Sequence, residues 1–249
     1  MYLPPILLTS SVIAMDPTVA LKSKESRIFH TLESIEKWRQ ISPNSHFVIC
    51  DGSDYDFSDL LNKEFPSLKI ESLHFMNNVD LIQKHGKGYG EGEIIRYALD
   101  NSIFLREADW FVKCTAKLWV ENFNSCILQW NKKFVCKAYF ANVFSLRRSV
   151  LEYIDTRFYM VDKDFYLNNF SNAYKNLSLD DGSSIETEFL RVLVDKKLDH
   201  CMFRVPPIIS GVGGGSGKYY NSSTLRKIKE SLRTRFISCS SRFRDLFIQ

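Results

Sequence analysis

Four glycines and two acids stand directly before a helical pattern in the stretch GKGYGEGEIIRYALDNS, residues 86–102. Glycine at a helix start costs conformational entropy, so ordinary packing does not favour it there. The unpaired N–H groups of a helix start can bind a phosphate or another anion, and glycine lets such a ligand approach the backbone. The stretch therefore indicates either an anion-binding helix entrance or a mobile surface loop.

A second candidate is the acid in VICDGSDYD, where Asp51 ends an apolar run. A carboxylate at the end of a buried strand can accept hydrogen bonds from a uracil N3–H or a ribose hydroxyl. Gly52 and Ser53 would let the ligand approach closely. The alternative is a plain turn at the end of the strand, because Asp-Gly is a common turn dipeptide.

Two lysines, Lys113 and Lys117, stand in VKCTAKLW, on the same face of a predicted strand. Transfer from a nucleoside diphosphate requires the charge of the departing phosphates to be neutralised, usually by a divalent ion. This stretch offers no carboxylate to hold such an ion, and the two ammonium groups could supply the charge instead. The alternative is a pair of lysines on a solvated strand face.

A general base for sugar transfer would be a carboxylate beside the acceptor hydroxyl. The segment LDDGSSIETEFL supplies several acids near a predicted helix start. Glu186 is the first choice, because an N-cap at Ser183 or Ser184 would hold it in the first helical turn. The other candidates are Asp180, Asp181 and Glu188, with Glu91 and Glu93 in reserve.

A second glycine-rich stretch, SGVGGGSGKYYNSS, spans residues 210–223. It offers backbone N–H groups, Lys218 and two tyrosines. We expect either a mobile lid that orders over a diphosphate or a flexible linker to the C-terminal segment. The five histidines show no pairing suited to a catalytic triad or a metal site, which argues against nucleophilic hydrolase chemistry.

Apolar runs alternate with helical patterns from the start of the chain, which predicts an α/β fold with a mostly parallel sheet covered on both faces. In such a sheet ligands bind beyond the carboxyl ends of the strands, so Asp51, the first glycine stretch and Lys113 are expected in one cleft. The expected strands are 5–13, 47–50, 68–75, 109–120, the first part of 133–154 and the end of 200–209. The expected helices are 23–42, one starting near Phe57, 91–102, the second part of 133–154 and 183–197.

The bulk properties favour one globular domain. The chain has 249 residues, 45% of them hydrophobic, and a net charge of +4. The six cysteines lack CxxC spacing, which predicts reduced core thiols in a cytoplasmic protein and argues against a zinc site. The longest apolar run is short and broken by proline, so neither a spanning helix nor a signal peptide is expected.

The C-terminal segment, residues 225–249, is rich in lysine and arginine interleaved with apolar residues. It predicts a basic amphipathic helix after a main domain of residues 1–224. Such a helix could bind an anionic membrane surface, at the inner face of the cytoplasmic membrane, or pack on its own domain. Nucleic acid is not expected as a partner, because the chain carries no known nucleic-acid module.

Four pieces of the sequence together resemble a family of bacterial glycosyltransferases from capsule and O-antigen gene clusters: ILLTSSVI, FVICDGSDYDFSDL, GKGYGEGEIIRYALDNS and DWFVKCTAKLWVENF. The likeness is strong over the first half of the chain and loose over the second. It implies a GT-A-like (Rossmann-like) fold and transfer of a sugar from a nucleotide-diphosphate donor to a growing polysaccharide. The donor-binding residues implied or added as candidates are Thr9, Asp51, Ser53, Lys87, Gly88, Gly90, Glu91, Lys113, Thr115, Lys117 and Lys218.

The chain departs from most GT-A enzymes at residues 113–117, where the Asp-x-Asp metal motif would stand. We therefore expect a metal-independent enzyme with no cofactor, with Mg²⁺ or Mn²⁺ as the alternative. The expected partners are a nucleotide-sugar donor, with UDP-hexose first and UDP-galactofuranose second, and a glycan or lipid-linked acceptor. A non-catalytic nucleotide-sugar-binding module of a polysaccharide assembly complex is the other reading. Inverting and retaining chemistry are both compatible with the sequence.

Overall fold

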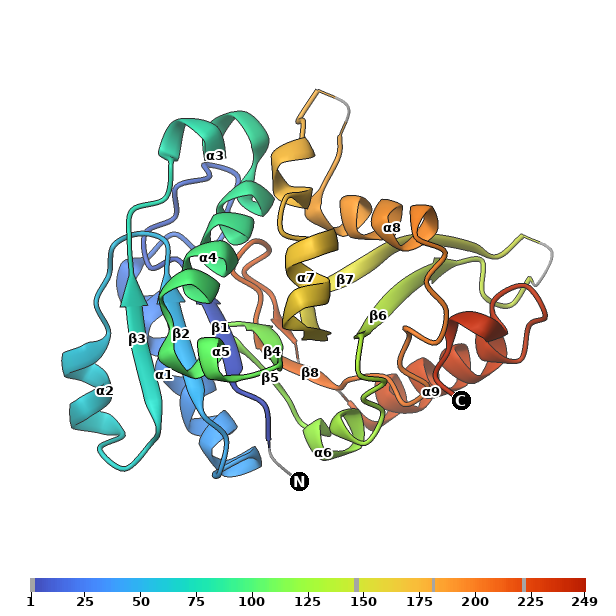
Figure 1. The fold of residues 1–249 in the computed structure, drawn as a ribbon, viewed down its shortest axis with the longest axis horizontal. Coiled ribbons are helices and arrows are strands. Elements are labelled where there is room, and N and C mark those ends of the chain that lie inside the picture. The colour runs from blue at the N-terminus through green and yellow to red at the C-terminus, as the bar shows by residue number, and fades with distance from the viewer. Residues whose placement is uncertain (1–2, 146–147, 181, 221–222) are drawn as a thin grey trace.

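A six-stranded sheet forms the centre of the computed structural model, which describes residues 3–145, 148–180, 182–220 and 223–249 (Figure 1). The strand order is β3-β2-β1-β4-β7-β6. The first four strands run parallel, and β7 and β6 are antiparallel to their neighbours. The predicted α/β class with a mostly parallel sheet is confirmed. The strands are β1 (Ile6–Ser10), β2 (Phe47–Asp51), β3 (Ile70–His74), β4 (Trp110–Thr115), β6 (Phe134–Ala141) and β7 (Val150–Asp162).

Helices cover both faces of this sheet, because successive strand side chains point to opposite sides. Leu7 belongs to one apolar core, which includes side chains of α4 and α8. Its neighbours Ile6 and Leu8 belong to a second core, which includes side chains of α1 and α6. The helices are α1 (Lys24–Ile41), α2 (Ser58–Glu64), α3 (Val79–His85), α4 (Lys87–Asn101), α5 (Ile103–Glu107), α6 (Phe123–Ile127), α7 (Lys163–Asn169), α8 (Ile185–Asp195), α9 (Thr224–Ser238) and the 3₁₀ turns η1 (Ala173–Asn176) and η2 (Arg244–Leu246).

The second half of the 133–154 segment is not a helix. Residues from Val150 onward form β7, which pairs with both β4 and β6. The prediction of a helix was wrong because Leu151 and Ile154 are three apart and mimic a helical face. β-Branched and aromatic residues dominate the rest of this strand and suit a sheet.

The expected strand 109–120 is divided between two sheets. β4 ends at Thr115, and a turn at residues 116–117 leads into β5 (Leu118–Val120). β5 pairs with β8 (Ile209–Val212), and β8 pairs with β9 (Tyr219–Tyr220). In the second glycine-rich stretch, residues 213–218 therefore form the turn of a β8–β9 hairpin, and residues 221–222 lie outside the described part of the chain.

The first glycine stretch is not a loop, because α4 already begins at Lys87, directly after Gly86. A side chain at Gly92 would overlap the ring of Tyr174 in η1, and one at Gly88 would press on Leu177. These glycines let α4 lie close to the segments packed on it, so packing explains them without a ligand.

The C-terminal helix is shorter than predicted, since α9 ends at Ser238. The chain then turns back onto the body, where Phe243 and Phe247 are buried in the first core. Met202 pairs with Phe247 through a β-bridge. Residues 239–249 are thus part of the packed fold. None of the helices in the described part of the chain is both long and apolar enough to cross a bilayer.

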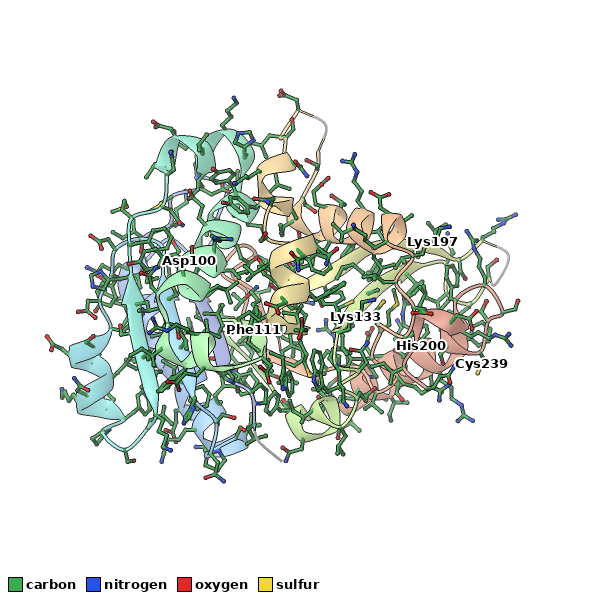
Figure 2. The ribbon with its side chains drawn as sticks, in the orientation of Figure 1. Asp100, Phe111, Lys133, Lys197, His200 and Cys239 are labelled. Atoms are coloured by element: carbon green, nitrogen blue, oxygen red, sulfur yellow. The ribbon has the colours of Figure 1, made fainter. Side chains whose placement is uncertain are left out.

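The cysteines are all free thiols, and five of them are buried. Cys239 is the exposed one, just after α9 (Figure 2). Burial raises the pKa of Cys50, Cys114 and Cys126 well above the ordinary thiol value. These thiols are accordingly inert packing groups.

Candidate functional site

A cavity of about 740 Å³ opens where β1 and β4 end. Its walls come from the start of α4, the start of α8, one face of β7 and the turn of the β8–β9 hairpin. This volume is typical of small-molecule sites, and the carboxyl ends of parallel strands are the usual place for them. The sequence-predicted residues that line it are Thr9, Lys87, Gly88, Gly90, Glu91, Thr115, Lys117 and Glu186.

Two buried cations, Arg27 and Lys117, stand at the wall of this cavity. Arg27 on α1 is 6% exposed and donates to the carbonyl oxygens of Ser11 (Nε–O 2.5 Å) and Leu21 (Nη1–O 2.8 Å). Lys117 is 2% exposed. Burial, and then the nearby charge of Arg27, lower the pKa of Lys117 to about 7. An anion bound here would relieve both effects.

The turn of the β8–β9 hairpin lies beside these cations. A side chain on Gly214 would come 3.0 Å from Cε of Lys117 and 3.6 Å from Arg27. The turn is tied down, because Ala20 N donates to Gly215 O (3.0 Å) and Leu21 N donates to Gly214 O (3.3 Å). The turn forms one wall of the cavity, and the expectation that it acts as a mobile lid stays a prediction.

Two further lysines were predicted near the donor. Lys87 reaches the same turn, since a side chain on Gly215 would come 2.8 Å from Lys87 Nζ. Lys218, in contrast, is exposed and does not line the cavity. Of these two, only Lys87 is placed to contact a ligand.

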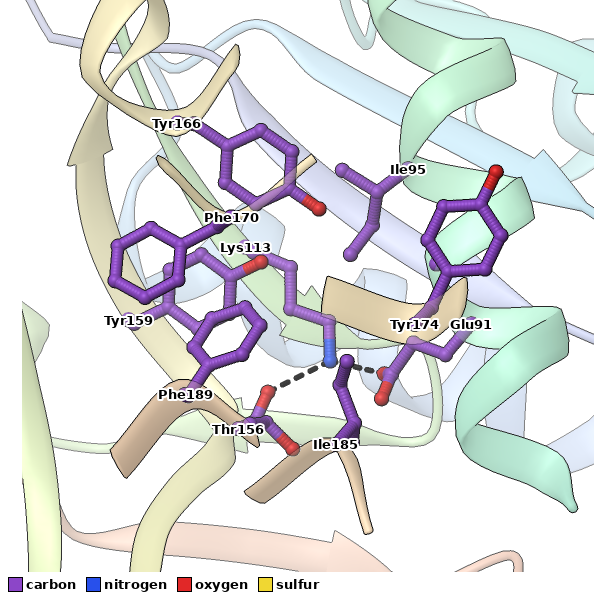
Figure 3. Close-up of a pocket in the computed structure, with 11 residues that line it drawn as sticks. Glu91, Ile95, Lys113, Thr156, Tyr159, Tyr166, Phe170, Tyr174, Ile185 and Phe189 are labelled. Atoms are coloured by element: carbon purple, nitrogen blue, oxygen red, sulfur yellow. Dashed lines mark hydrogen bonds and ion pairs between the residues drawn. The ribbon is translucent and has the colours of Figure 1, made fainter. Parts of the chain in front are cut away.

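Lys113 is fully buried and does not line the large cavity. Its Nζ forms an ion pair with Glu91 and donates to the carbonyl oxygen of Thr156 (2.7 Å) and to Thr115 Oγ1 (3.3 Å) (Figure 3). Thr9 Oγ1 donates to the same Glu91 oxygen (3.2 Å). The expectation that Lys113 and Lys117 lie on one strand face and both reach the donor was wrong, because β4 ends at Thr115 and only Lys117 lines the cavity; the alternative of two solvated lysines was also wrong, because both are buried. The ion pair of Lys113 fixes the position of the Glu91 carboxylate.

A second, much smaller cavity of about 10 Å³ lies on the far side of this ion pair, large enough for one water molecule. Aromatic rings enclose it, among them Tyr159, Tyr166 and Phe189 (Figure 3). Burial raises the pKa of both tyrosines well above the ordinary value. Glu91, Thr156 and Ile185 line both cavities, so the two spaces are neighbours.

Asp51 is completely buried. Its carboxylate accepts from the backbone N–H of Val12 (2.9 Å), from the N–H (2.8 Å) and hydroxyl (2.5 Å) of Ser53, and from Tyr55 N (3.3 Å). Ser53 Oγ in turn accepts from Ile13 N (2.9 Å). Neither Asp51 nor Ser53 lines the cavity. Their hydrogen bonds join the loops after β1 and β2. Direct contact of Asp51 or Ser53 with a nucleotide stays a prediction, because neither side chain is exposed in the cavity.

Glu186 lines the cavity from the first turn of α8. The expected cap is present at Ser184, whose hydroxyl accepts from Thr187 N in a capping box. Among the described residues, the Glu186 carboxylate has no hydrogen bond or ion pair. Among the described acids of residues 180–188, Glu186 is the one that lines the cavity.

The other carboxylate candidates lie elsewhere. Glu93 accepts from the N–H of Asn78 (3.0 Å) and is not in the cavity wall; burial raises its pKa. Glu188 is buried, with Arg191 3.8 Å away. Asp180 is exposed and does not line the cavity, and Asp181 lies outside the described residues.

Sequence reasoning missed an ion pair in the β7 wall. Arg157 donates to both oxygens of Asp155 (Nε–Oδ1 2.8 Å, Nη2–Oδ2 2.6 Å), and its guanidinium lies 4.8 Å from the centre of the Tyr220 ring. Burial alone would raise the pKa of Asp155 and lower that of Arg157. The ion pair between them has the larger effect, so the pKa of Asp155 is lowered and that of Arg157 is raised. Both groups stay charged at neutral pH.

Among the described residues, the cavity wall contains four carboxylates, those of Asp16, Glu91, Asp155 and Glu186. The described part of the chain contains no group of three His, Cys, Asp or Glu side chains arranged to hold a metal ion. The acids in the cavity wall are partly occupied, since Lys113 binds Glu91 and Arg157 binds Asp155. Positive charge at this site comes from side chains.

Comparison with known proteins gives limited similarity. No protein-family model and no curated protein matches the sequence. Similar solved structures include a candidate nucleotide-diphospho-sugar transferase from Desulfovibrio desulfuricans, with 9% identity, 81% of this chain and 80% of that chain covered, and a TM-score of 0.47. An active-site mutant of LgtC has 10% identity, coverage of 76% and 69%, and a TM-score of 0.47.

A glycosyltransferase involved in glycosylation of the major capsid of PBCV-1 has 13% identity, coverage of 80% and 81%, and a TM-score of 0.43. Similarity at these levels is too low to assign an activity to this chain.

Proposed function

We propose that this chain is a glycosyltransferase that takes a sugar from a nucleotide-diphosphate donor without a resident metal ion. One observation carries the proposal: two buried cations, Arg27 and Lys117, stand beside a glycine turn in a ligand-sized cavity at the carboxyl ends of parallel strands. Burial opposes both charges, the nearby carboxylates of Asp51 and Glu91 offset part of that cost, and a bound anion would offset more of it. A diphosphate is an anion of suitable size and charge.

Each residue of the site has a separate role in the proposed reaction. Arg27 and Lys117 bind the diphosphate, and the N–H groups of the glycine turn are near enough to add to them. The acceptor oxygen forms a bond to the anomeric carbon, while the bond from that carbon to the β-phosphate oxygen breaks and its electron pair leaves on the phosphate. The two cations stabilise the charge that develops there. The acceptor hydroxyl gives its proton to the free carboxylate of Glu186.

Glu91 contributes a second carboxylate, which forms an ion pair with Lys113 and accepts a hydrogen bond from Thr9. Its position beside the end of β1 suits hydrogen bonds to hydroxyls of the donor sugar. The resemblance of the sequence to capsule and O-antigen transferases favours UDP-hexose as donor, with UDP-galactofuranose second, and a surface polysaccharide or lipid-linked glycan as acceptor.

Thermal-shift measurements with UDP, GDP and CMP, each in EDTA, test this proposal. A nucleotide at a hundredfold excess over its Kd stabilises the folded state by about 2.7 kcal/mol, which corresponds to a rise in Tm of about 5–10 °C for a chain of this size. We expect this rise for UDP. The absence of a shift with all three nucleotides and their sugars would contradict the proposal.

We further propose that α9 attaches the enzyme to an anionic membrane surface. Its apolar residues Leu225, Ile228, Leu232 and Phe236 lie on one helical stripe and are 41–80% exposed. The exposed basic residues of the same helix are Arg226, Lys229 and Arg235. An apolar stripe beside basic side chains matches a membrane with acidic headgroups. α9 lies at the opposite end of the molecule from α2 (Figure 1).

The double substitution Leu225→Ser and Leu232→Ser tests this attachment in co-sedimentation with phosphatidylserine vesicles. Each leucine is worth about 1.5–3 kcal/mol when it is buried, so we expect binding to fall at least tenfold. Phe29→Ser on α1, also 63% exposed, is the control and should pellet as the wild type does. Equal pelleting of the double variant would contradict the attachment. Deletion of 225–249 is unsuitable, since it removes the buried Phe243 and Phe247.

A further inference from the structure

We propose that Tyr153 and Tyr139 form a platform that binds a sugar ring of the acceptor at the mouth of the cavity. This inference rests on the proposed glycosyltransferase function and adds a subsite to it. The platform belongs to the β6–β7 hairpin, which contributes one wall of the cavity.

The two rings form a pre-built stack. Tyr139 and Tyr153 are direct partners across β6 and β7, and their ring centres lie 5.0 Å apart with an angle of 10° between the planes. The guanidinium of Arg233 on α9 lies 5.9 Å from the centre of the Tyr139 ring. Tyr139 therefore has a neighbour on each of two elements, which limits the freedom of the stack.

The stack is exposed although it is aromatic. Tyr153 is 37% exposed and Tyr139 43% exposed, and Tyr153 lines the large cavity. Exposed aromatic surface gains free energy when a ligand covers it. A rigid tyrosine also loses little conformational entropy on binding. The apolar C–H face of a pyranose ring is flat enough to lie on such a ring, while its hydroxyls stay directed outward.

The order of residues along β7 connects this platform to the reaction site. Tyr153 lines the same cavity as Asp155 and Arg157, although the register of β7 with β6 shifts just beyond Asp155. A sugar on Tyr153 would thus lie next to the Asp155–Arg157 pair, whose polar atoms can hydrogen-bond its hydroxyls and orient one of them toward the donor.

The far end of the platform points toward α9. Arg233 donates to the carbonyl oxygen of Phe140 (3.0 Å) and Lys137 pairs with Glu230 (2.9 Å), so the hairpin and α9 are joined on this side. An acceptor that is attached to a lipid would therefore extend from Tyr153 past Tyr139 toward the helix that carries the exposed apolar stripe.

Saturation-transfer NMR in the presence of UDP tests the platform, with methyl β-glycosides of glucose, galactose, N-acetylglucosamine and mannose as probes. We expect saturation of ring C–H protons of at least one glycoside by wild-type protein. Tyr153→Ala should reduce that signal at least fivefold, Tyr139→Ala should reduce it less, and Tyr153→Phe should retain it because the ring remains. Tyr219→Ala, which removes an exposed tyrosine outside the cavity wall, is the matched control and should leave the signal unchanged.

The thermal shift by UDP is recorded for every variant. If UDP still stabilises the protein but no glycoside binds, or if Tyr153→Ala binds the glycosides as the wild type does, the platform is wrong and the proposed function stands. If no nucleotide stabilises the protein, the proposed function fails and the platform falls with it.

Discussion

Lys113→Ala is expected to lower the free energy of unfolding by about 3–5 kcal/mol, the usual effect of removing one partner of a buried ion pair. Lys113 is fully buried, and its Nζ binds Glu91 and the carbonyl oxygen of Thr156. The substitution leaves Glu91 without its counter-charge and opens space beside the aromatic rings of the small cavity. Urea unfolding of the free protein measures the change.

A double-mutant cycle separates the effect of the lost positive charge from the effect of the space that alanine leaves. Lys113→Met keeps the length of the side chain but still strands the Glu91 carboxylate, so it should remain destabilising. Adding Glu91→Gln removes the stranded charge and should recover part of the loss. If Lys113→Ala unfolded at the wild-type urea concentration and lost turnover alone, Lys113 would be a catalytic cation and not the support of Glu91.

Lys117→Met is expected to stabilise the free protein and to weaken its binding of UDP. The pKa of Lys117 is about 7 in the folded protein, against 10.5 for an ordinary lysine. Between these two pH values the unfolded chain binds more protons, so the stability of the wild type should rise as pH increases from 7 toward 10.5. The full difference is on the order of 5 kcal/mol. The variant should lack this slope, and its advantage should be largest below pH 7 and vanish above 10.5.

Anion binding should raise the lowered pKa of Lys117, because a diphosphate beside it favours the protonated amine. UDP binding above pH 7 should therefore take up a proton, and UDP affinity should fall by up to about tenfold per pH unit between 7 and 9. Calorimetric titrations in two buffers of different ionisation enthalpy measure the uptake. Lys196→Met, an exposed lysine on the far end of α8, is the control and should behave as the wild type. Binding of UDP with no proton uptake would show that Lys117 does not contact the diphosphate.

Local patterns in the sequence were sufficient to predict the elements whose conformation is set by residues close together in the chain. The apolar run that ends at Asp51 gave a buried parallel strand, and the serines before Glu186 gave a helix cap and the position of that acid at the cavity. β7 could not be recognised in this way, because its partners β4 and β6 decide its conformation. The residues 151 and 154 fit a helix as well as a strand.

The sequence alone could not predict which residues form the site, because its members are far apart along the chain and become neighbours only in the fold. The alternation of a strand puts Lys113 on one face, but only the fold brings Glu91 of α4 against it. The glycine stretch was interpreted as an anion-binding helix entrance or a mobile loop because Tyr174, which packs on Gly92 from 82 positions later, was unknown as a neighbour. Arg27 was missed because arginine is rarely buried, yet the buried face of α1 includes Arg27, Thr31 and Ser34 beside Ile35 and Trp38.

Calorimetric titration of UDP into the wild-type protein at pH 7 in EDTA tests the central claim most directly, namely that Arg27 and Lys117 bind the diphosphate without a metal ion. We predict binding at one site, an affinity that Mn²⁺ does not raise when it replaces EDTA, and at least tenfold weaker binding of uridine, which lacks the diphosphate. UDP that binds only after Mn²⁺ is added, or that binds no better than uridine, would contradict the account.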